Sequence, residues 1–140
     1  MANVAFPQPE DLGPREWGTE TLLLLVPGKY TLKKITMKAG AKGGLQYHHL
    51  KDEGGVMISG YMLVRYDDGA GNLTERMCRP GDVFHFPPEA VHQAEAVTDC
   101  AYYEVSTPHF NDRVHAEDKY GLKDEAGGLP STKLEQVELR

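Results

Sequence analysis

The sequence has little of what marks disulfide-rich or membrane-spanning proteins. Only two cysteines, Cys78 and Cys100, occur among 140 residues, and they do not form a CxxC pair. This scarcity argues against a disulfide framework or a thiolate zinc site. The longest apolar run, residues 22–26, is far too short to cross a bilayer. We therefore expect two buried, reduced thiols and no membrane partner.

Positive charge is also scarce. Fifteen Lys and Arg residues stand against 21 Asp and Glu residues, a formal net charge of −6. Such a chain repels a phosphate backbone, so nucleic acid is not an expected partner. The N-terminus has neither the basic nor the apolar region of a secretory signal, which predicts a cytoplasmic location. A length of 140 residues suits one domain with a single core.

The 15 glycines and nine prolines interrupt the chain at short intervals and leave little room for long helices. We expect strands at 21–26, 30–38, 45–50, 56–59, 61–66, 73–78, 83–86, 91–97 and 101–105. In residues 30–38, Thr31, Lys33, Ile35 and Met37 should share one face. Helix is expected only near 111–120 and 132–139. This density of strands predicts an all-β sandwich, jelly roll or small barrel.

The segment 46–53 gathers groups that can bind a metal. On a strand, Gln46, His48 and Leu50 share one face. Glu53 comes just before two glycines, where we expect a turn that folds its carboxylate over that face, and His92 on a later hairpin could add a fourth ligand. The alternative is that the histidines are half-exposed strand residues and Glu53 is a solvated acid, which a lone pair of histidines would favour.

Two separated segments resemble the motifs of the cupin superfamily. In the first motif an H-x-H pair is followed by a glutamate and, after six further residues, a glycine. Gln46 and His48 occupy the H-x-H positions, and Glu53 and Gly60 match the second half.

The second cupin motif also recurs, in the right order and separation. Gly81, Pro87 and His92 fall at its intervals, whereas Glu89 replaces its second glycine and Ala96 replaces its asparagine. The two motifs together identify the chain as resembling a cupin.

Within cupins, the chain looks most like the C-terminal domain of type II mannose-6-phosphate isomerases. The matching stretches lie between Pro14 and Gly121 and are residues 17–20, 45–49, 79–82, 106–108 and 117–121. The resemblance implies a cupin double-stranded β-helix, a jelly-roll barrel with a short helical C-terminal segment. We divide the chain into an N-terminal arm (1–18), a barrel (19–110) and a C-terminal extension (111–140).

The resemblance also implies a site and partners. It makes Gln46, His48, Glu53 and His92 the ligands of one divalent metal, for which Zn, Mn, Fe, Co and Ni remain open. It further implies metal-dependent isomerisation of a carbohydrate substrate, and a homodimer in which the arm adds to the partner's sheet.

The chain departs from the isomerase pattern at several positions. The family's third histidine and following arginine are Leu50 and Lys51 here, and His115 stands where the family has an arginine that could bind phosphate as a bidentate fork. With the net charge of −6, these losses make a strongly anionic substrate the less favoured choice. Arg113 could compensate for the missing arginine if that segment is remodelled, although its side chain is expected to face elsewhere.

The sequence does not identify the remaining residues of the site. Candidate general bases on neighbouring strands are His85, Tyr47 and Tyr61. Candidate substrate-binding residues are Lys42, Tyr103 and His115.

Three function classes stay open. The first is a metal-dependent isomerase or epimerase of a sugar or related polyhydroxy compound. The second is a cupin oxygenase or lyase acting on a small organic acid, which would more usually have a histidine-rich ligand set. The third is a non-catalytic small-molecule-binding cupin.

Overall fold

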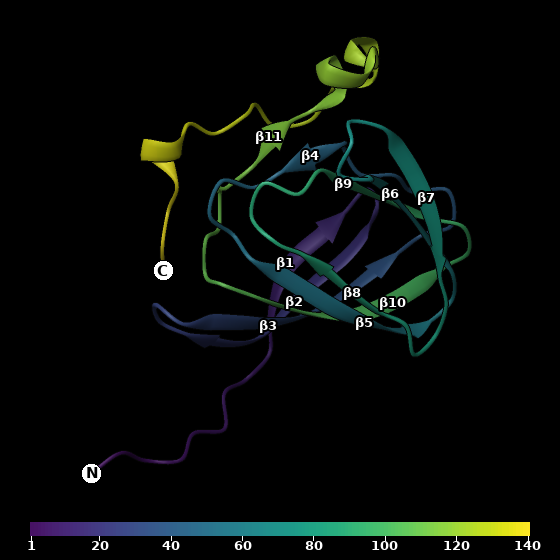
Figure 1. The fold of residues 1–140 in the computed structure, drawn as a ribbon. Coiled ribbons are helices and arrows are strands. Elements are labelled where there is room, and N and C mark those ends of the chain that lie inside the picture. Colours follow the sequence, from purple (N-terminus) through teal and green to yellow (C-terminus); the bar gives the residue numbers. More distant parts are fainter.

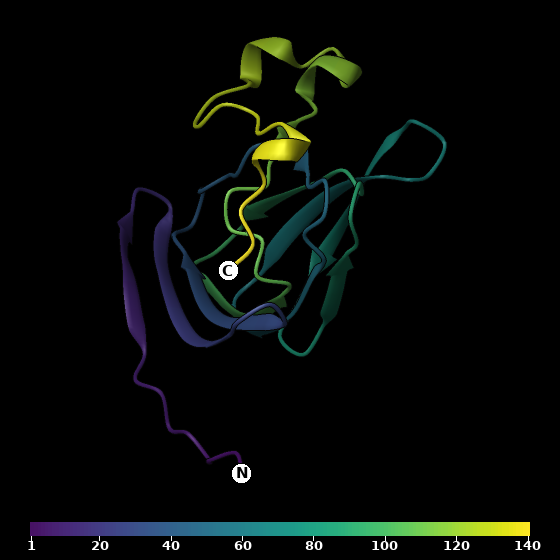
Figure 2. The ribbon, with the colours of Figure 1, turned by 90° about the vertical axis from the view of Figure 1, so that its left-hand side faces the viewer.

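Two antiparallel sheets pack face to face and enclose the interior of the molecule (Figures 1 and 2). The computed structural model describes residues 1–140. One sheet has the order β1-β2-β3-β10-β5-β8 and the other the order β11-β4-β9-β6-β7. The strands are β1 (Glu10–Arg15), β2 (Gly18–Val26), β3 (Tyr30–Met37), β4 (Gln46–Tyr47), β5 (Glu53–Ser59), β6 (Met62–Asp67), β7 (Leu73–Cys78), β8 (Val83–Phe86), β9 (His92–Ala96), β10 (Cys100–Ser106) and β11 (Val114–His115). The predicted all-β jelly roll is confirmed.

Alternation along the strands separates the interior from the surface. In β3, Thr31, Lys33, Ile35 and Met37 are all buried, as their shared face predicted. Between the sheets lies one apolar core made of Ile35, Met37, Met57, Met62, Val64, Cys78, Phe84, Ala96 and Cys100. Both cysteines are buried free thiols, as expected, and burial raises the pKa of each.

The glycines at 54 and 55 do not form the turn expected from the sequence, which is a correction. They lie inside β5, paired with β8 and β10, so Glu53 is the first residue of a central strand. The physical reason is close packing. A Cβ on Gly55 would lie 2.5 Å from a ring carbon of Phe84 and 2.5 Å from the backbone oxygen of Tyr103. Only glycine lets the strand pass beneath that ring.

The strand expected at 45–50 is also shorter than predicted, because only Gln46 and Tyr47 belong to β4.

Gly60, the last residue of the first motif, has a φ of +74°, and a Cβ there would lie 2.0 Å from the backbone oxygen of Asp99. Both the backbone conformation and the contact therefore require glycine at this position.

The first 18 residues are partly ordered within their own chain. Residues 10–15 form β1, which pairs with β2 at the edge of the six-stranded sheet. Residues 1–9 extend away from the barrel (Figure 2), with Val4 and Phe6 exposed. Homodimerisation through this arm stays a prediction.

The C-terminal extension passes across one end of the barrel (Figure 2). Its helices are all of the 3-10 type: η1 (Glu117–Tyr120), η2 (Lys123–Glu125) and η3 (Leu134–Gln136). Backbone hydrogen bonds from Phe110 to Glu138, from Gly28 to Arg140 and from Arg140 to Pro108 hold the tail against the body. The structure contains no helix with the length and apolar character that a membrane crossing requires.

Substitution of Gly55 tests the close packing that places Glu53. We expect Gly55→Ala to lower the free energy of unfolding by about 1–3 kcal/mol, because the new methyl group has no space. Gly127→Ala is the control, since a Cβ there meets nothing within 4 Å, and it should be neutral or slightly stabilising. Urea denaturation of both variants measures the difference, and equal stability would contradict the packing argument.

Candidate metal centre

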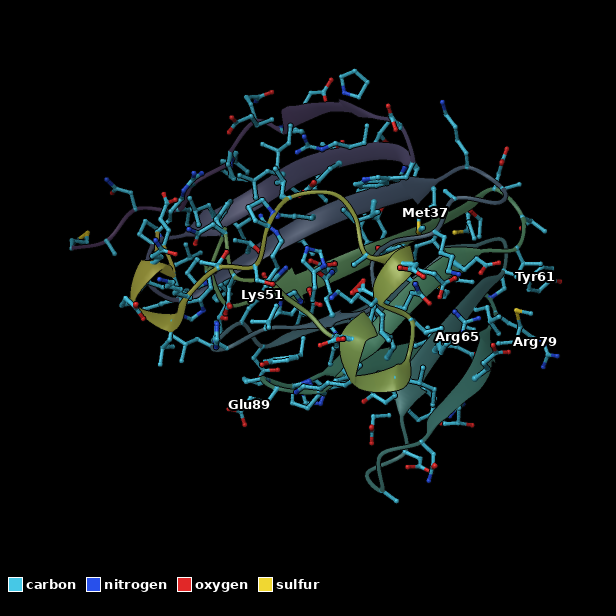
Figure 3. The ribbon with its side chains drawn as sticks, turned by 90° about the horizontal axis from the view of Figure 1, so that it is seen from above. Met37, Lys51, Tyr61, Arg65, Arg79 and Glu89 are labelled. Atoms are coloured by element: carbon cyan, nitrogen blue, oxygen red, sulfur yellow. The ribbon has the colours of Figure 1, made fainter.

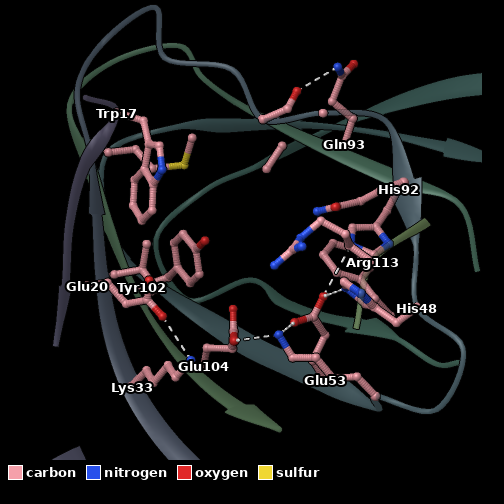
Figure 4. Close-up of a pocket in the computed structure, with 18 of the residues that line it drawn as sticks. Trp17, Glu20, Lys33, His48, Glu53, His92, Gln93, Tyr102, Glu104 and Arg113 are labelled. Carbon is pink, nitrogen blue, oxygen red and sulfur yellow. Dashed lines mark hydrogen bonds and ion pairs between the residues drawn. The ribbon is translucent and has the colours of Figure 1, made fainter. Parts of the chain in front are cut away.

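A cavity of about 530 Å³ lies between the two sheets and contains both apolar and charged side chains. Trp17 and Tyr102 lie on one side of it, and His48, Glu53 and His92 lie on another (Figure 4). This mixed lining is typical of a small-molecule site.

Three strands bring together the histidines and the glutamate. His48 follows β4, Glu53 begins β5 and His92 begins β9. The Nε2 atoms of His48 and His92 lie 3.0 Å and 3.2 Å from Oε1 of Glu53. One ligand atom from each residue lies within 4.8 Å of the other two, and all three residues are buried. The structure thus brings together three of the four residues expected to bind a metal.

The hydrogen bonds of the two histidines determine which ring nitrogen faces Glu53. The Nδ1 of His48 bonds the backbone oxygen of Asp112, and the Nδ1 of His92 bonds that of Ala90 at 2.9 Å. A carbonyl can only accept, so each neutral imidazole carries its proton on Nδ1 and presents the Nε2 lone pair to the carboxylate. Lone pairs that converge in this way repel one another unless protons or a metal ion lie between them. The donor set therefore fits a divalent metal.

Glu53 is kept ionised for this role. Burial alone would raise its pKa, but the ammonium of Lys51, 2.9 Å from Oε2, is the strongest of the influences that hold the pKa well below its usual range. Lys51 in turn remains protonated: burial opposes its charge, yet Glu53 and Glu104 raise its pKa. One carboxylate oxygen thus faces the histidines while the other pairs with Lys51.

Gln46, the fourth expected ligand, lines the same cavity. It pairs directly with His92 across β4 and β9, so the two side chains leave the sheet on one face. Its role as a ligand stays a proposal.

Packing and backbone contacts fix the histidine rings. The ring of Phe86 stacks on that of His92 with centroids 4.1 Å apart. The buried carboxylate of Asp112 accepts the backbone N–H groups of His49, Leu50 and Lys51 at 2.7–2.9 Å. Asp112 thereby ends the strand and turns the chain, which explains a correction: Leu50 does not share the face of His48 but is 46% exposed.

Further ion pairs lie among the residues that line the cavity (Figure 4). Lys33 lies 2.9 Å from Glu20, and Lys51 lies 3.8 Å from Glu104. Burial, opposed by Lys51 but reinforced by Glu53, raises the pKa of Glu104 to about 7. Burial, with the nearby carboxylates of Glu104 and Glu53, raises the pKa of Tyr102 well above its usual range. The cavity therefore holds one carboxyl group able to exchange a proton near neutral pH and one phenol that stays protonated.

The candidate bases expected from the sequence do not line this cavity. His85 is exposed and lies 2.7 Å from Asp52. Tyr47 points to the other face of β4, against His49 and Lys119. Tyr61 lies at the periphery of the molecule, far from Lys51 in the interior (Figure 3).

The candidate substrate-binding residues also lie outside it. Lys42 pairs with Glu125 at 3.8 Å, and Tyr103 lies on the outer face of β10. His115 bonds the backbone oxygen of Leu129 and lies 3.7 Å from Glu117. None of these three side chains lines the cavity.

Two residues that were not assigned to the site from the sequence, Glu104 and Arg113, line the cavity. Strand alternation could have identified Glu104, because Tyr102 and Glu104 face inward whereas Tyr103 and Val105 face outward. The expectation that Arg113 faces elsewhere is wrong. Its backbone precedes β11, and its position depends on contacts between distant segments that no local pattern contains.

The turn before His92 has an unusual backbone conformation. Glu89 is the only non-glycine residue with a positive φ, +70°, and it occupies the position at which the second cupin motif has glycine. Its N–H donates to the backbone oxygen of His48 at 2.8 Å, and the next residue, Ala90, accepts from His92. The turn therefore links both histidines, and a strained residue sustains it.

Restoring glycine at this turn should relieve the strain. We expect Glu89→Gly to raise the free energy of unfolding by about 1 kcal/mol, since glycine adopts this conformation without a steric cost. Glu89→Ala is the control and should give no gain, because alanine keeps the Cβ. Thermal and urea unfolding measure both variants. A gain in the alanine variant would instead assign the effect to the carboxylate.

Comparisons with known proteins agree with this architecture. No family model and no curated protein sequence matches the chain. Solved structures match in fold. The capsular polysaccharide assembling protein CapF from Staphylococcus aureus gives a TM-score of 0.62 at 19% identity, over 71% of this chain but only 28% of CapF. KdgF from Halomonas sp. gives 0.59 at 19% identity, over 69% of this chain and 85% of KdgF.

A third solved structure that matches in fold is described as a member of the cupin superfamily. A sugar phosphate isomerase from the cupin superfamily, from Silicibacter pomeroyi, gives a TM-score of 0.55 at 20% identity, over 70% of this chain and 66% of that protein. None of the three is described as a mannose-6-phosphate isomerase, so that finer resemblance stays a prediction. At these identities the likeness concerns the fold alone: the chain has the cupin fold, with a candidate metal centre inside its barrel.

Proposed function

We propose that this protein binds one divalent metal through Gln46, His48, Glu53 and His92 and isomerises or epimerises a sugar or related polyhydroxy compound. The observation that carries the proposal is the convergence of two Nε2 lone pairs on a buried, ionised carboxylate. The cupin sugar phosphate isomerase among the fold neighbours supports the same reaction class.

The cavity contains the groups that such a reaction needs. A metal held at the centre would polarise a carbonyl or hydroxyl oxygen of the substrate and make the adjacent C–H more acidic. Glu104 would accept that proton and return it to the neighbouring carbon. Its ion pair with Lys51 fixes the carboxylate near the centre, and the phenol of Tyr102 would donate a hydrogen bond to a substrate oxygen.

Two other classes predict different measurements. A cupin oxygenase would contain iron and consume oxygen when substrate is added. A non-catalytic binding cupin would bind a ligand without proton exchange at carbon. We expect neither of these results.

Proton exchange at carbon tests the isomerase proposal. We would incubate aldoses and ketoses, free and phosphorylated, with the metal-loaded protein in D₂O. The substrate should gain deuterium next to the carbonyl, as NMR can show. Substrate-dependent oxygen uptake would overturn the proposal.

Metal binding can be tested without a substrate. We expect His92→Ala to reduce the metal content from one ion per chain to almost none, measured by elemental analysis, with an unchanged circular dichroism spectrum. His85→Ala is the matched control, because His85 is 64% exposed and bonds only Asp52. Normal metal content in His92→Ala would show that the centre is wrongly assigned.

Glu104 can be tested by removing its charge while keeping its shape. We expect Glu104→Gln to lower kcat by about 10²–10⁴-fold, the usual contribution of a general acid–base group, with normal metal content. Tyr103→Phe, on the outer face of the same strand, is the control and should retain full activity. Unchanged deuterium exchange in Glu104→Gln would exclude Glu104 as the proton carrier.

A further inference from the structure

Arg113 differs from every other positively charged residue of the cavity. Lys33 and Arg15 pair with Glu20, and Lys51 pairs with Glu53 and Glu104. Arg113 has no carboxylate within 4 Å. Its single side-chain hydrogen bond, to the backbone oxygen of Pro130, is long at 3.4 Å. A guanidinium has five N–H donors, so most of those of Arg113 remain available to a ligand.

The position of Arg113 is fixed by its neighbours. The preceding residue, Asp112, is held by the three backbone N–H groups of the turn at 49–51. The backbone oxygen of Arg113 itself accepts the N–H of Thr132 at 2.7 Å. With the chain fastened on both sides, the guanidinium points into the cavity beside His48 and His92 (Figure 4). Such preorganisation lowers the entropy cost of binding a ligand.

The charge balance of the cavity points to the ligand. The cavity is lined by equal numbers of cationic and anionic side chains. The cations are Arg15, Lys33, Lys51 and Arg113, and the carboxylates are Glu20, Glu53, Glu104 and Asp112. A divalent metal would leave this set with two uncompensated positive charges. Protonation of Glu104 would increase the excess. An anionic ligand would neutralise it, in a setting where charges are poorly screened.

The structure assigns Arg113 as the binding site for an anionic group of the substrate, a carboxylate or a phosphate, beside the metal centre. The planar fork of the guanidinium matches both groups through two parallel hydrogen bonds. This inference rests on the proposed function, which supplies the metal centre beside Arg113. It reverses the sequence-based preference for a substrate without strong negative charge. The missing arginine of the isomerase pattern is replaced from a position two residues earlier.

Three polyols that cannot be isomerised separate the anionic group from the sugar-like chain. Sorbitol is neutral, gluconate carries a carboxylate and sorbitol 6-phosphate carries a phosphate. We would titrate each into the Zn²⁺-loaded and the metal-free protein by calorimetry at constant ionic strength. At least one anionic probe should bind roughly tenfold or more tightly than sorbitol, since charge-assisted bidentate hydrogen bonds are stronger than hydrogen bonds between neutral groups. The stronger of the two shows which anion the cavity takes.

Substitutions then identify the residue responsible. Arg113→Gln should abolish the preference for the anionic probes, and Arg113→Lys should retain part of it, because lysine keeps the charge but loses the fork. Arg79→Gln, at the periphery of the molecule (Figure 3), is the control and should leave the preference unchanged. Circular dichroism and metal content verify that each variant is folded and loaded.

The outcomes separate this inference from the proposed function. Equal binding of sorbitol and both anions, no binding of any probe, or an undiminished preference in Arg113→Gln would each overturn the role of Arg113. If the protein binds no metal but shows an anion preference that depends on Arg113, the proposed metal function fails and the anion site stands.

Discussion

The site depends on the burial of one ionised carboxylate. Glu53 is 7% exposed and lies between Lys51 on one side and two histidines on the other. A buried charge is costly unless it is paired, and Lys51, in the loop between β4 and β5, supplies the cationic partner. Two glycines next to Glu53 allow its strand to pass beneath Phe84, and the loop anchored by Asp112 directs Lys51 inward. These local features together stabilise a single charge.

Much of this arrangement could be predicted from the sequence. Period-two alternation gave the buried face of β3 correctly, and the spacing of the two motifs brought together His48, Glu53 and His92. Glycine proved ambiguous: the pair at 54–55 predicts a turn in isolation, yet it forms a strand because an aromatic ring covers it. Alternation along β10 could have assigned Glu104 to the site, whereas Arg113 could not be assigned from a local pattern, because packing between distant segments positions it.

The net charge of the chain and the charge of its cavity carry different information. The formal charge of −6 describes the whole protein, and it governs long-range attraction and solubility. Inside the barrel, cationic and anionic side chains are equal in number and mostly paired. A small ligand responds to the local field, where water screens little. The global charge therefore does not determine which ligand the cavity binds.

The candidate metal centre and the proposed anion-binding arginine come from different parts of the chain. His48, Glu53 and His92 belong to the barrel, whereas Arg113 and the neighbouring Leu129 belong to the extension that passes across its end. The extension also supports the candidate centre, because the backbone oxygen of Asp112 bonds Nδ1 of His48 and its carboxylate holds the turn that carries Lys51. A substitution at Arg113 would therefore change the lining of the cavity next to a residue on which the position of His48 depends.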